Sequence, residues 1–320
     1  GNAIVDILAY TTDSFLESRS LSKGNMTLIN EIEAEKLYSE MNDCIHASGG
    51  SAANTLTGLS QLGCSSCFIG RVKDDKLGEI FKTEISVSGT FYKTPSTIEG
   101  PSTARCFVFI TPDAQRTMCT FLGASVSLDP KDLDLSIIKD SKILYLEGYL
   151  FDSPAAKEAF FSAAKISKKY GGKVALSLSD SFCVDRHRES FIDLVNNHVD
   201  ILFANEGELI SLYKSSSLKE AMNSIEGKCE TAVITCGENG SKVLSKTDCF
   251  DIEPYKIGSV IDTTGAGDLY ASGFLYGYIN EKDLLTCGKL GSICAGQIVT
   301  ELGPRSKVSL TTLTKKYLEN

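Results

Sequence analysis

Short apolar segments alternate with helical segments through the second half of the 320-residue chain, and this alternation constrains the fold most strongly. Four apolar segments read as strands: residues 142–146, 173–178, 200–204 and 231–235. A helix is predicted over residues 153–170, with Ser153 at the cap, Pro154 in the first turn and Gly171 past its end. The pattern predicts an α/β fold with a mostly parallel central sheet covered by helices on both faces.

The sequence pattern changes between residues 89 and 122, where β-rich segments appear. The β-rich segments 104–111 and 116–122 flank a turn at Pro112 and Asp113, which predicts a hairpin. Together with residues 9–29, this region predicts a small β-sheet lid over 9–29 and 89–122. Residues 1–8, 30–88 and 123–320 are then expected to form the large domain. Within it, Asn30 and Glu33 are spaced as a capping box at the start of a helix.

Composition excludes several classes of function. A net charge of −9 and a pI near 5.0 argue against nucleic acid or an anionic membrane as partner. The apolar runs are shorter than the ~18–20 residues of a membrane span, and no signal peptide is recognised, so a cytoplasmic monomer or homodimer is expected. Eleven cysteines are then predicted to be free thiols. Three well-separated histidines argue against a multi-histidine metal centre or a Ser-His-Asp triad.

The strongest motif is DTTGAGD at residues 262–268, followed by an apolar helical segment. Gly265, Ala266 and Gly267 let the backbone approach a ligand closely, and the free N–H groups of the next helix face the same loop. Together they predict an anion-binding site. Asp268 lies in the first helical turn, where an acidic residue can also serve simply to stabilise the helix start.

Two further motifs precede predicted helices. In GGSAAN at residues 49–54, Gly50 permits an irregular turn while Ser51 and Asn54 offer hydrogen bonds to a polyhydroxylated ligand. Asn205 and Glu208 follow a predicted strand, where they could order Mg²⁺ through its waters. An ordinary helix cap explains each motif equally well, and for the first motif the cap is the favoured interpretation.

A fourth motif, TCGENG at residues 235–240, ends the last of the four predicted strands. Thr235, Gly237 and Gly240 could receive nucleotide phosphates, or the glycines could simply form a hairpin.

In this order and spacing, the four motifs resemble those of the ribokinase-like (phosphofructokinase B) family of sugar and nucleoside kinases. The resemblance spans essentially the whole chain, and the motif at 262–268 is its most specific part. Gly70, Val72, Asp75 and Gly78 fit another family segment, although Lys73 stands where glycine is common. The opening GNAIVDI is more similar to adenosine kinases and their bacterial relatives than to ribokinase.

The resemblance implies a role for each motif. Asp268 would act as general base, and the amides of Gly265, Ala266 and Gly267 would stabilise the transferred phosphoryl group. Acceptor-binding positions would be Asn2, Asp6, Gly50, Ser51, Asn54, Arg116 and Phe182. ATP-binding positions would be Asn205, Thr235, Gly237, Gly240, Thr264, Gly265 and Gly267, with Mg²⁺ near Asn205 and Glu208. Residues 262–264 and 303–306 would offer a site for K⁺.

The implied reaction is transfer of the ATP γ-phosphoryl group to the primary hydroxyl of a nucleoside, with adenosine preferred. Leu8, Met26 and Met118 would line a lid face able to stack a purine. A sugar kinase acting on ribose, fructose or a keto-deoxy sugar acid is the alternative, and an acid would require extra Arg or Lys near Asp6. A non-catalytic nucleoside-binding relative is the third reading, against which Asp268 counts.

Overall fold

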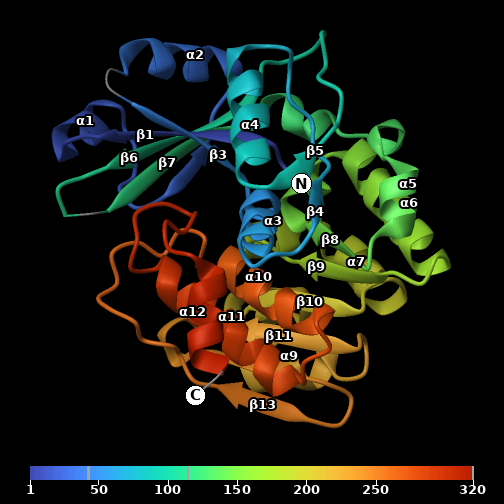
Figure 1. Ribbon diagram of the computed structural model, residues 1–320. Helices are drawn as coiled ribbons and strands as arrows, with labels where there is room; N and C mark the ends of the chain where they lie inside the picture. Colours follow the sequence, from blue (N-terminus) through green and yellow to red (C-terminus); the bar gives the residue numbers. More distant parts are fainter. Residues whose placement is uncertain (42–43, 114, 319–320) are drawn as a thin grey trace.

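The computed structural model describes residues 1–320 except 42–43, 114 and 319–320 (Figure 1). Its larger sheet has the strand order β13-β12-β11-β10-β9-β8. Four strands of this sheet run parallel: β8 (Ile143–Glu147), β9 (Lys173–Ser177), β10 (Ile201–Asn205) and β11 (Thr231–Thr235). β12 (Ser241–Leu244) and β13 (Cys249–Ile252) extend it antiparallel. The predicted α/β alternation is confirmed.

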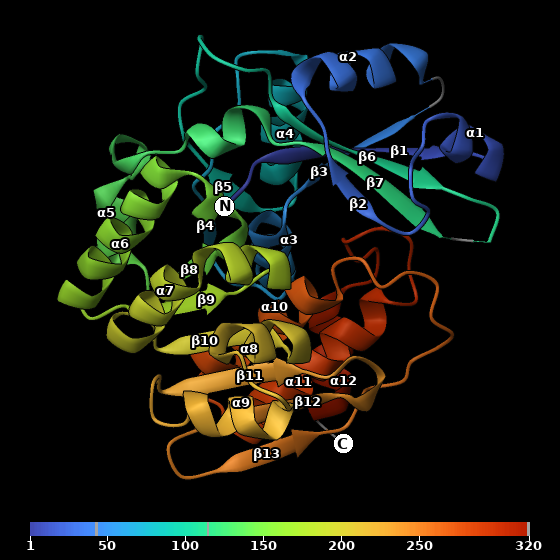
Figure 2. The same cartoon turned by 180° about the vertical axis from the view of Figure 1, so that it is seen from behind.

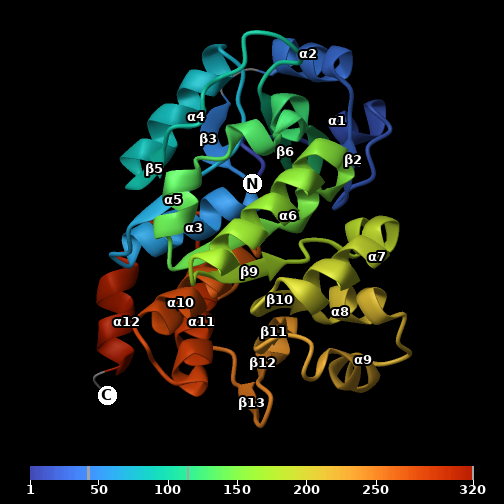
Figure 3. The same cartoon turned by 90° about the vertical axis from the view of Figure 1, so that its right-hand side faces the viewer.

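Both faces of the larger sheet are buried, as the apolar strands require. Alternate residues of β9 and β10 belong to different cores: Leu176 and Leu202 pack on one side, Ala175 and Phe203 on the other. The first side is covered by α6 (Pro154–Lys169), α7 (Ser181–Asn197), α8 (Glu206–Tyr213) and α9 (Leu218–Ile225). The second is covered by α3 (Ser51–Gln61), α10 (Ala266–Ile279) and α11 (Leu284–Ile298), with α12 (Leu310–Leu318) beside them (Figure 3).

Local signals set several helix ends where the sequence predicts them. α2 (Glu31–Glu40) begins with the capping box of Asn30 and Glu33, and α6 begins with Ser153 as cap and Pro154 in its first turn. α4 (Lys76–Val87) is capped by Asp75. The remaining helices are α1 (Asp13–Ser18) and α5 (Leu135–Asp140).

A second, smaller sheet lies beside the large one (Figure 2) and has the order β2-β7-β6-β1-β3. Its strands are β1 (Ile4–Tyr10), β2 (Met26–Leu28), β3 (Ile45–Gly49), β6 (Ala104–Ile110) and β7 (Arg116–Phe121). The β6–β7 hairpin is as predicted.

The boundaries predicted for the lid differ from this sheet. β1 and β3, expected in the large domain, are two of its five strands, and β5 (Thr90–Tyr92) pairs instead with β4 (Ser66–Phe68) outside it. Pairing between strands far apart in sequence caused the difference, because β1 contacts β6 about a hundred residues later and leaves no local signal of that pairing.

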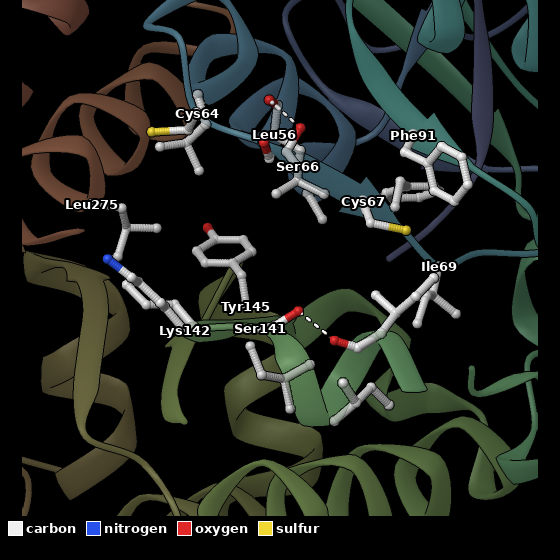
Figure 4. A pocket seen from close by; sticks show the side chains of 18 of the residues that line it. Leu56, Cys64, Ser66, Cys67, Ile69, Phe91, Ser141, Lys142, Tyr145 and Leu275 are labelled. Atoms are coloured by element: carbon white, nitrogen blue, oxygen red, sulfur yellow. Dashed lines mark hydrogen bonds between the residues drawn. The ribbon is translucent and has the colours of Figure 1, made fainter. Parts of the chain in front are cut away.

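A cavity of about 850 Å³ lies between β4 and β8 (Figure 4). Each of these strands is at the edge of its sheet, and Leu56, Cys67, Tyr145 and Leu275 are among the side chains around the space. All eleven cysteines lie in the described part of the chain and are free thiols, as predicted. Across that same part, no helix is long and apolar enough to cross a bilayer.

Candidate active site

A second cavity, of about 760 Å³, lies between the two sheets. The last residues of four parallel strands reach it: Glu147, Ser177, Asn205 and Thr235. Side chains of the smaller sheet line the opposite wall, and include Ile4, Asp6, Leu8, Met26, Arg116 and Met118. This is the carboxyl edge of a parallel sheet, where α/β proteins bind their ligands.

Asp268 enters this cavity from the first turn of α10. Ser51 Oγ donates to its Oδ1 at 2.6 Å, and Asn54 Nδ2 donates to its Oδ2 at 3.0 Å. The pKa of Asp268 is raised to about 6. Burial is the largest cause, the two hydrogen bonds act in the opposite direction, and the charge of Glu147 adds to the rise. The structure therefore gives Ser51 and Asn54 a contact that the sequence did not predict: both hold the Asp268 carboxylate.

Close packing of two helices fixes that arrangement. α3 packs on α10, and Ser272 Oγ donates to the carbonyl oxygen of Thr55 at 2.8 Å. A Cβ on Gly58 would lie 2.4 Å from Ser272 Oγ, so only glycine permits this approach. Further along α10, Gly273 and Gly277 pack against α11.

The glycine loop at the start of α10 is built around a buried carboxylate. Asp262 accepts hydrogen bonds from Thr264 N at 3.0 Å and from Gly303 N at 2.8 Å. Arg116, from β7, pairs with Asp262 at 2.5 Å and donates to Thr264 Oγ1 at 3.1 Å. The carboxylate is thus already compensated by a cation and two backbone N–H groups, and the K⁺ site expected at this loop stays a prediction.

The lack of a side chain has a different consequence at Gly265 and at Gly267. Gly265 has φ +78°, and a Cβ there would lie 2.8 Å from Pro304 Cα. A Cβ on Gly267 would meet no described atom within 4 Å, which leaves open space at the start of α10. The first turn of α10 therefore has its backbone N–H groups beside the cavity, the arrangement that binds anions.

The acceptor side predicted from the sequence is brought together around β1. Asn2 is buried, and its Nδ2 donates a hydrogen bond to Glu147 Oε1 at 3.0 Å. Gly50 has φ +99°, and a Cβ added there would lie only 2.2 Å from the Asn2 carbonyl oxygen. Asp6 lies against Gly49. Burial raises the pKa of Asp6 to about 7, whereas Arg305 and Arg116 lower it. Phe182, at the start of α7, lines the cavity with its side chain 74% exposed.

The predicted magnesium residues form a capping box at the start of α8. Asn205 Oδ1 accepts from Glu208 N, and Glu208 Oε2 accepts from Asn205 N, each at 2.9 Å. Burial raises the pKa of Glu208 to about 7, and the nearby Asp180 raises it further. Since both Glu208 oxygens already accept hydrogen bonds, the residues fit a Mg²⁺ ion held through its waters rather than directly.

Of the predicted phosphate positions, Thr235 and Thr264 line the cavity with the glycine loop. Gly237 and Gly240 instead shape the turn between β11 and β12, and neither is among the lining residues. β11 and β12 therefore form a hairpin through this segment, and phosphate binding by Gly237 and Gly240 stays a prediction.

Sequence reasoning missed Glu147, Asp180 and Arg305. Glu147 ends a predicted strand and Asp180 caps α7, so their positions at strand ends were the available signal. Arg305 lies in the segment 303–306, which was expected only as a K⁺ site, and nothing in its local pattern indicates its electrostatic interaction with Asp6.

A buried carboxylate beside a helix start, at the carboxyl edge of a parallel sheet, is an arrangement suited to phosphoryl transfer. The chain belongs to the pfkB family of carbohydrate kinases, which it matches over residues 26–311. It is therefore a phosphotransferase with an alcohol group as acceptor, with a ribokinase-like fold, and its family uses ATP.

Three relatives are informative about the acceptor. An adenosine kinase from Sinorhizobium meliloti is 44% identical, with a TM-score of 0.92 over 99% of this chain and 97% of that one. A probable sugar kinase from Rhizobium etli CFN 42 is also 44% identical, with a TM-score of 0.92 over 99% and 96%. The 5-dehydro-2-deoxygluconokinase of Bacillus subtilis (strain 168) is 28% identical over 85% of this chain and 87% of that protein.

Proposed function

We propose that this protein is an adenosine kinase, which transfers the γ-phosphoryl group of ATP to the primary hydroxyl of adenosine and so returns the nucleoside to the AMP pool. One observation carries the choice of acceptor: the cavity is polar around Asp6 and Asp268 and apolar where Leu8, Met26 and Met118 of the smaller sheet line it. Three exposed apolar side chains line it: Met26 (46%), Leu28 (54%) and Phe182 (74%). A purine would cover this apolar surface, whereas a sugar without a base would leave it exposed to water. The 44% identical adenosine kinase supports the same choice.

The geometry supports a simple chemical sequence. Asp6 accepts hydrogen bonds from the ribose hydroxyls and fixes the primary hydroxyl near Asp268. As the O–P bond forms and the bond to the ADP leaving group breaks, the hydroxyl proton passes to Asp268. Little deprotonation is needed early, because the transition state is loose, so a carboxyl with a pKa of about 6 suffices.

Charge that develops on the transferred group faces the amides of Gly265, Ala266 and Gly267. Asn205 and Glu208 would hold Mg²⁺ through its waters, and the ion would supply positive charge that compensates the ATP phosphates. The smaller sheet, whose Arg116 already contacts the glycine loop, acts as the lid that excludes water.

A sugar-acid kinase is the second candidate, because two arginines, Arg116 and Arg305, act on Asp6. An acidic acceptor would require extra cationic groups near Asp6. The Bacillus subtilis relative, whose name denotes a sugar-acid acceptor, supports this alternative.

The test is kcat/KM with Mg-ATP for adenosine, guanosine, ribose, fructose and 5-dehydro-2-deoxygluconate, measured side by side. Burial of ~100 Å² of purine surface adds about 2.5 kcal/mol, so adenosine should exceed ribose by nearly a hundredfold. A higher value for any sugar would overturn the nucleoside assignment and retain the kinase. Adenosine binding by calorimetry with no turnover of any acceptor would instead indicate a non-catalytic nucleoside-binding protein.

A further inference from the structure

We propose that Asp152 and Arg186 form a specificity site for the polar edge of the nucleobase, in which the Asp152 carboxylate accepts a hydrogen bond from the 6-amino group of a purine. The inference deepens the proposed function and rests on it, because only a nucleoside acceptor brings a base to this part of the cavity.

Both residues lie on the acceptor side of the cavity and line it. Asp152 ends the short 3-10 helix Gly148–Asp152 that follows β8, and Arg186 lies in α7, which follows β9. The end of β8 is also where Glu147 accepts a hydrogen bond from Asn2 at the start of β1. The residues expected to bind Mg²⁺ and phosphates follow β10 and β11 instead, so a base beside Asp152 would lie away from them.

Arg186 and Asp152 form a two-pronged ion pair. Arg186 Nε donates to Asp152 Oδ1 at 3.0 Å, and Arg186 Nη2 donates to Asp152 Oδ2 at 2.7 Å. His187 Nε2 lies 2.6 Å from the same Oδ1. Lys157 Nζ, which can only donate, lies 3.3 Å from His187 Nδ1. Nδ1 is therefore the acceptor of this ring, and Nε2 carries the proton that is donated to Asp152.

A kink in α7 lets two adjacent residues reach this one carboxylate. Neighbouring side chains of a regular α-helix point about 100° apart and do not face each other. His187 has φ −124° and ψ 22°, outside the helical range, so the chain changes direction directly after Arg186. The His187 ring is also packed against Phe151, with 6.4 Å between the ring centroids. Asp152 is therefore held from two sides in one orientation.

The pair retains hydrogen-bonding capacity for a ligand. A carboxylate offers about four lone-pair sites, and Asp152 uses two at Oδ1 and one at Oδ2, which leaves an acceptor position at Oδ2. Arg186 directs two of its N–H groups at Asp152, and no hydrogen bond to the described residues occupies the others. The two side chains are 50% and 31% exposed for Arg186 and Asp152, so a ligand in the cavity can reach them.

These groups match the edge of an adenine stacked on Phe182. Phe182 lies one turn before Arg186 on the same face of α7, lines the same cavity and is 74% exposed. Adenine presents an amino donor beside a ring-nitrogen acceptor, which complement Asp152 Oδ2 and the Arg186 guanidinium. A 6-oxopurine would place an oxygen against the Asp152 carboxylate instead, and a sugar without a base would reach neither residue.

The first arm of the experiment uses the wild type and three nucleosides with the same ribose and primary hydroxyl. They are adenosine, purine riboside, which lacks the 6-amino group, and inosine, which carries a 6-oxo group. Calorimetry without ATP gives each Kd, and turnover with Mg-ATP gives kcat/KM. Adenosine should bind at least about tenfold more tightly than purine riboside, as expected for a hydrogen bond to a charged group, and inosine should bind more weakly still.

The second arm asks whether Asp152 carries this preference. Asp152→Asn keeps the shape and can offer an N–H to a 6-oxo group, so the preference for adenosine over inosine should fall at least about tenfold. The change should lie mainly in the acceptor KM, with KM for ATP within about twofold of wild type. Asp185→Asn is the matched control: Asp185 also lies on α7 and pairs with Arg188, but it does not line the cavity. This control should leave the preference unchanged.

Equal affinity for adenosine and purine riboside in the wild type would overturn the proposal without any variant. An unchanged preference in Asp152→Asn, or a change in KM for ATP alone, would also overturn it. Failure of the proposed function is a different result, in which the wild type phosphorylates a sugar faster than adenosine. The Kd values of the three nucleosides then still decide whether the site recognises a base, and binding of none of them would overturn both proposals.

Discussion

Removal of the Ser51 hydroxyl should shift the pH dependence of turnover. Ser51 Oγ donates to the Asp268 carboxylate at 2.6 Å, and this bond favours the ionised form. Hydrogen bonds to charged groups contribute about 1.5–3 kcal/mol, and 1.36 kcal/mol corresponds to one pKa unit. Ser51→Ala should therefore raise the pKa of Asp268 from about 6 by roughly one unit, or by about two if no water replaces the hydroxyl.

The sign follows from the role of Asp268. The carboxylate must be ionised to accept the proton, so turnover falls as the pH drops through its pKa. With a pKa of about 6, half of wild-type Asp268 is ionised at pH 6, and a rise of one unit would leave about a tenth ionised. Loss of kcat should therefore be about fivefold at pH 6 and small near pH 8.

The assay is kcat against pH at saturating acceptor and ATP, because kcat reports the pKa in the bound complex. Ser60→Ala is the matched control: Ser60 also lies on α3, but its hydroxyl bonds Ser66 at 2.6 Å and Thr90 at 3.1 Å. An acid limb of Ser51→Ala that coincides with the wild-type limb, in a protein with an unchanged Tm, would refute the reasoning.

Three further predictions concern the other polar groups of the cavity. Asp268→Asn should lower kcat by at least about a hundredfold. Burial raises the pKa of this group above its ordinary 3.8, so the ionised carboxylate is disfavoured in the fold. The Tm of the variant at pH 8 should therefore be no lower than that of the wild type. Activity above about 1% of wild type, or a large fall in Tm, would contradict this prediction. Asp6→Ala should raise KM for the acceptor more than about tenfold with KM for ATP unchanged, and the reverse pattern would place the acceptor elsewhere. Glu208→Gln keeps a residue able to form the capping box, so Tm should hold while the Mg²⁺ concentration for half-maximal rate rises; an unchanged Mg²⁺ requirement would remove Glu208 from the metal site.

Much of the large domain could be predicted because its signals are local. The capping box of Asn30 and Glu33, the cap at Ser153 and the apolar strands with buried alternate faces each act over a few residues. The glycine loop before Asp268 is equally local, since one helix start supplies its N–H groups.

The smaller sheet and the environment of Asp268 could not be predicted in the same way. β1 reads as an apolar strand of any sheet, and its pairing with β3 and β6 depends on tertiary packing. Ser51 and Asn54 carry the signal of a helix start, and only the packing of α3 on α10 shows that they meet a carboxylate. No local sequence pattern marks Arg305, because it acts through its charge on Asp6, which lies far away in the sequence.

The contacts that define the site also set the order in which the protein can fold. Ser51 and Asn54 meet Asp268 across 217 and 214 residues of sequence, and Arg116 meets Thr264 across 148. Such long loops are closed late and slowly, because their entropy is lost before the contact forms. During synthesis, the N-terminal half can fold its sheet and helices while Ser51 and Asn54 still face solvent. The hydrogen bonds of Ser51 and Asn54 to Asp268 can therefore form only after α10 has been synthesised and has packed on α3.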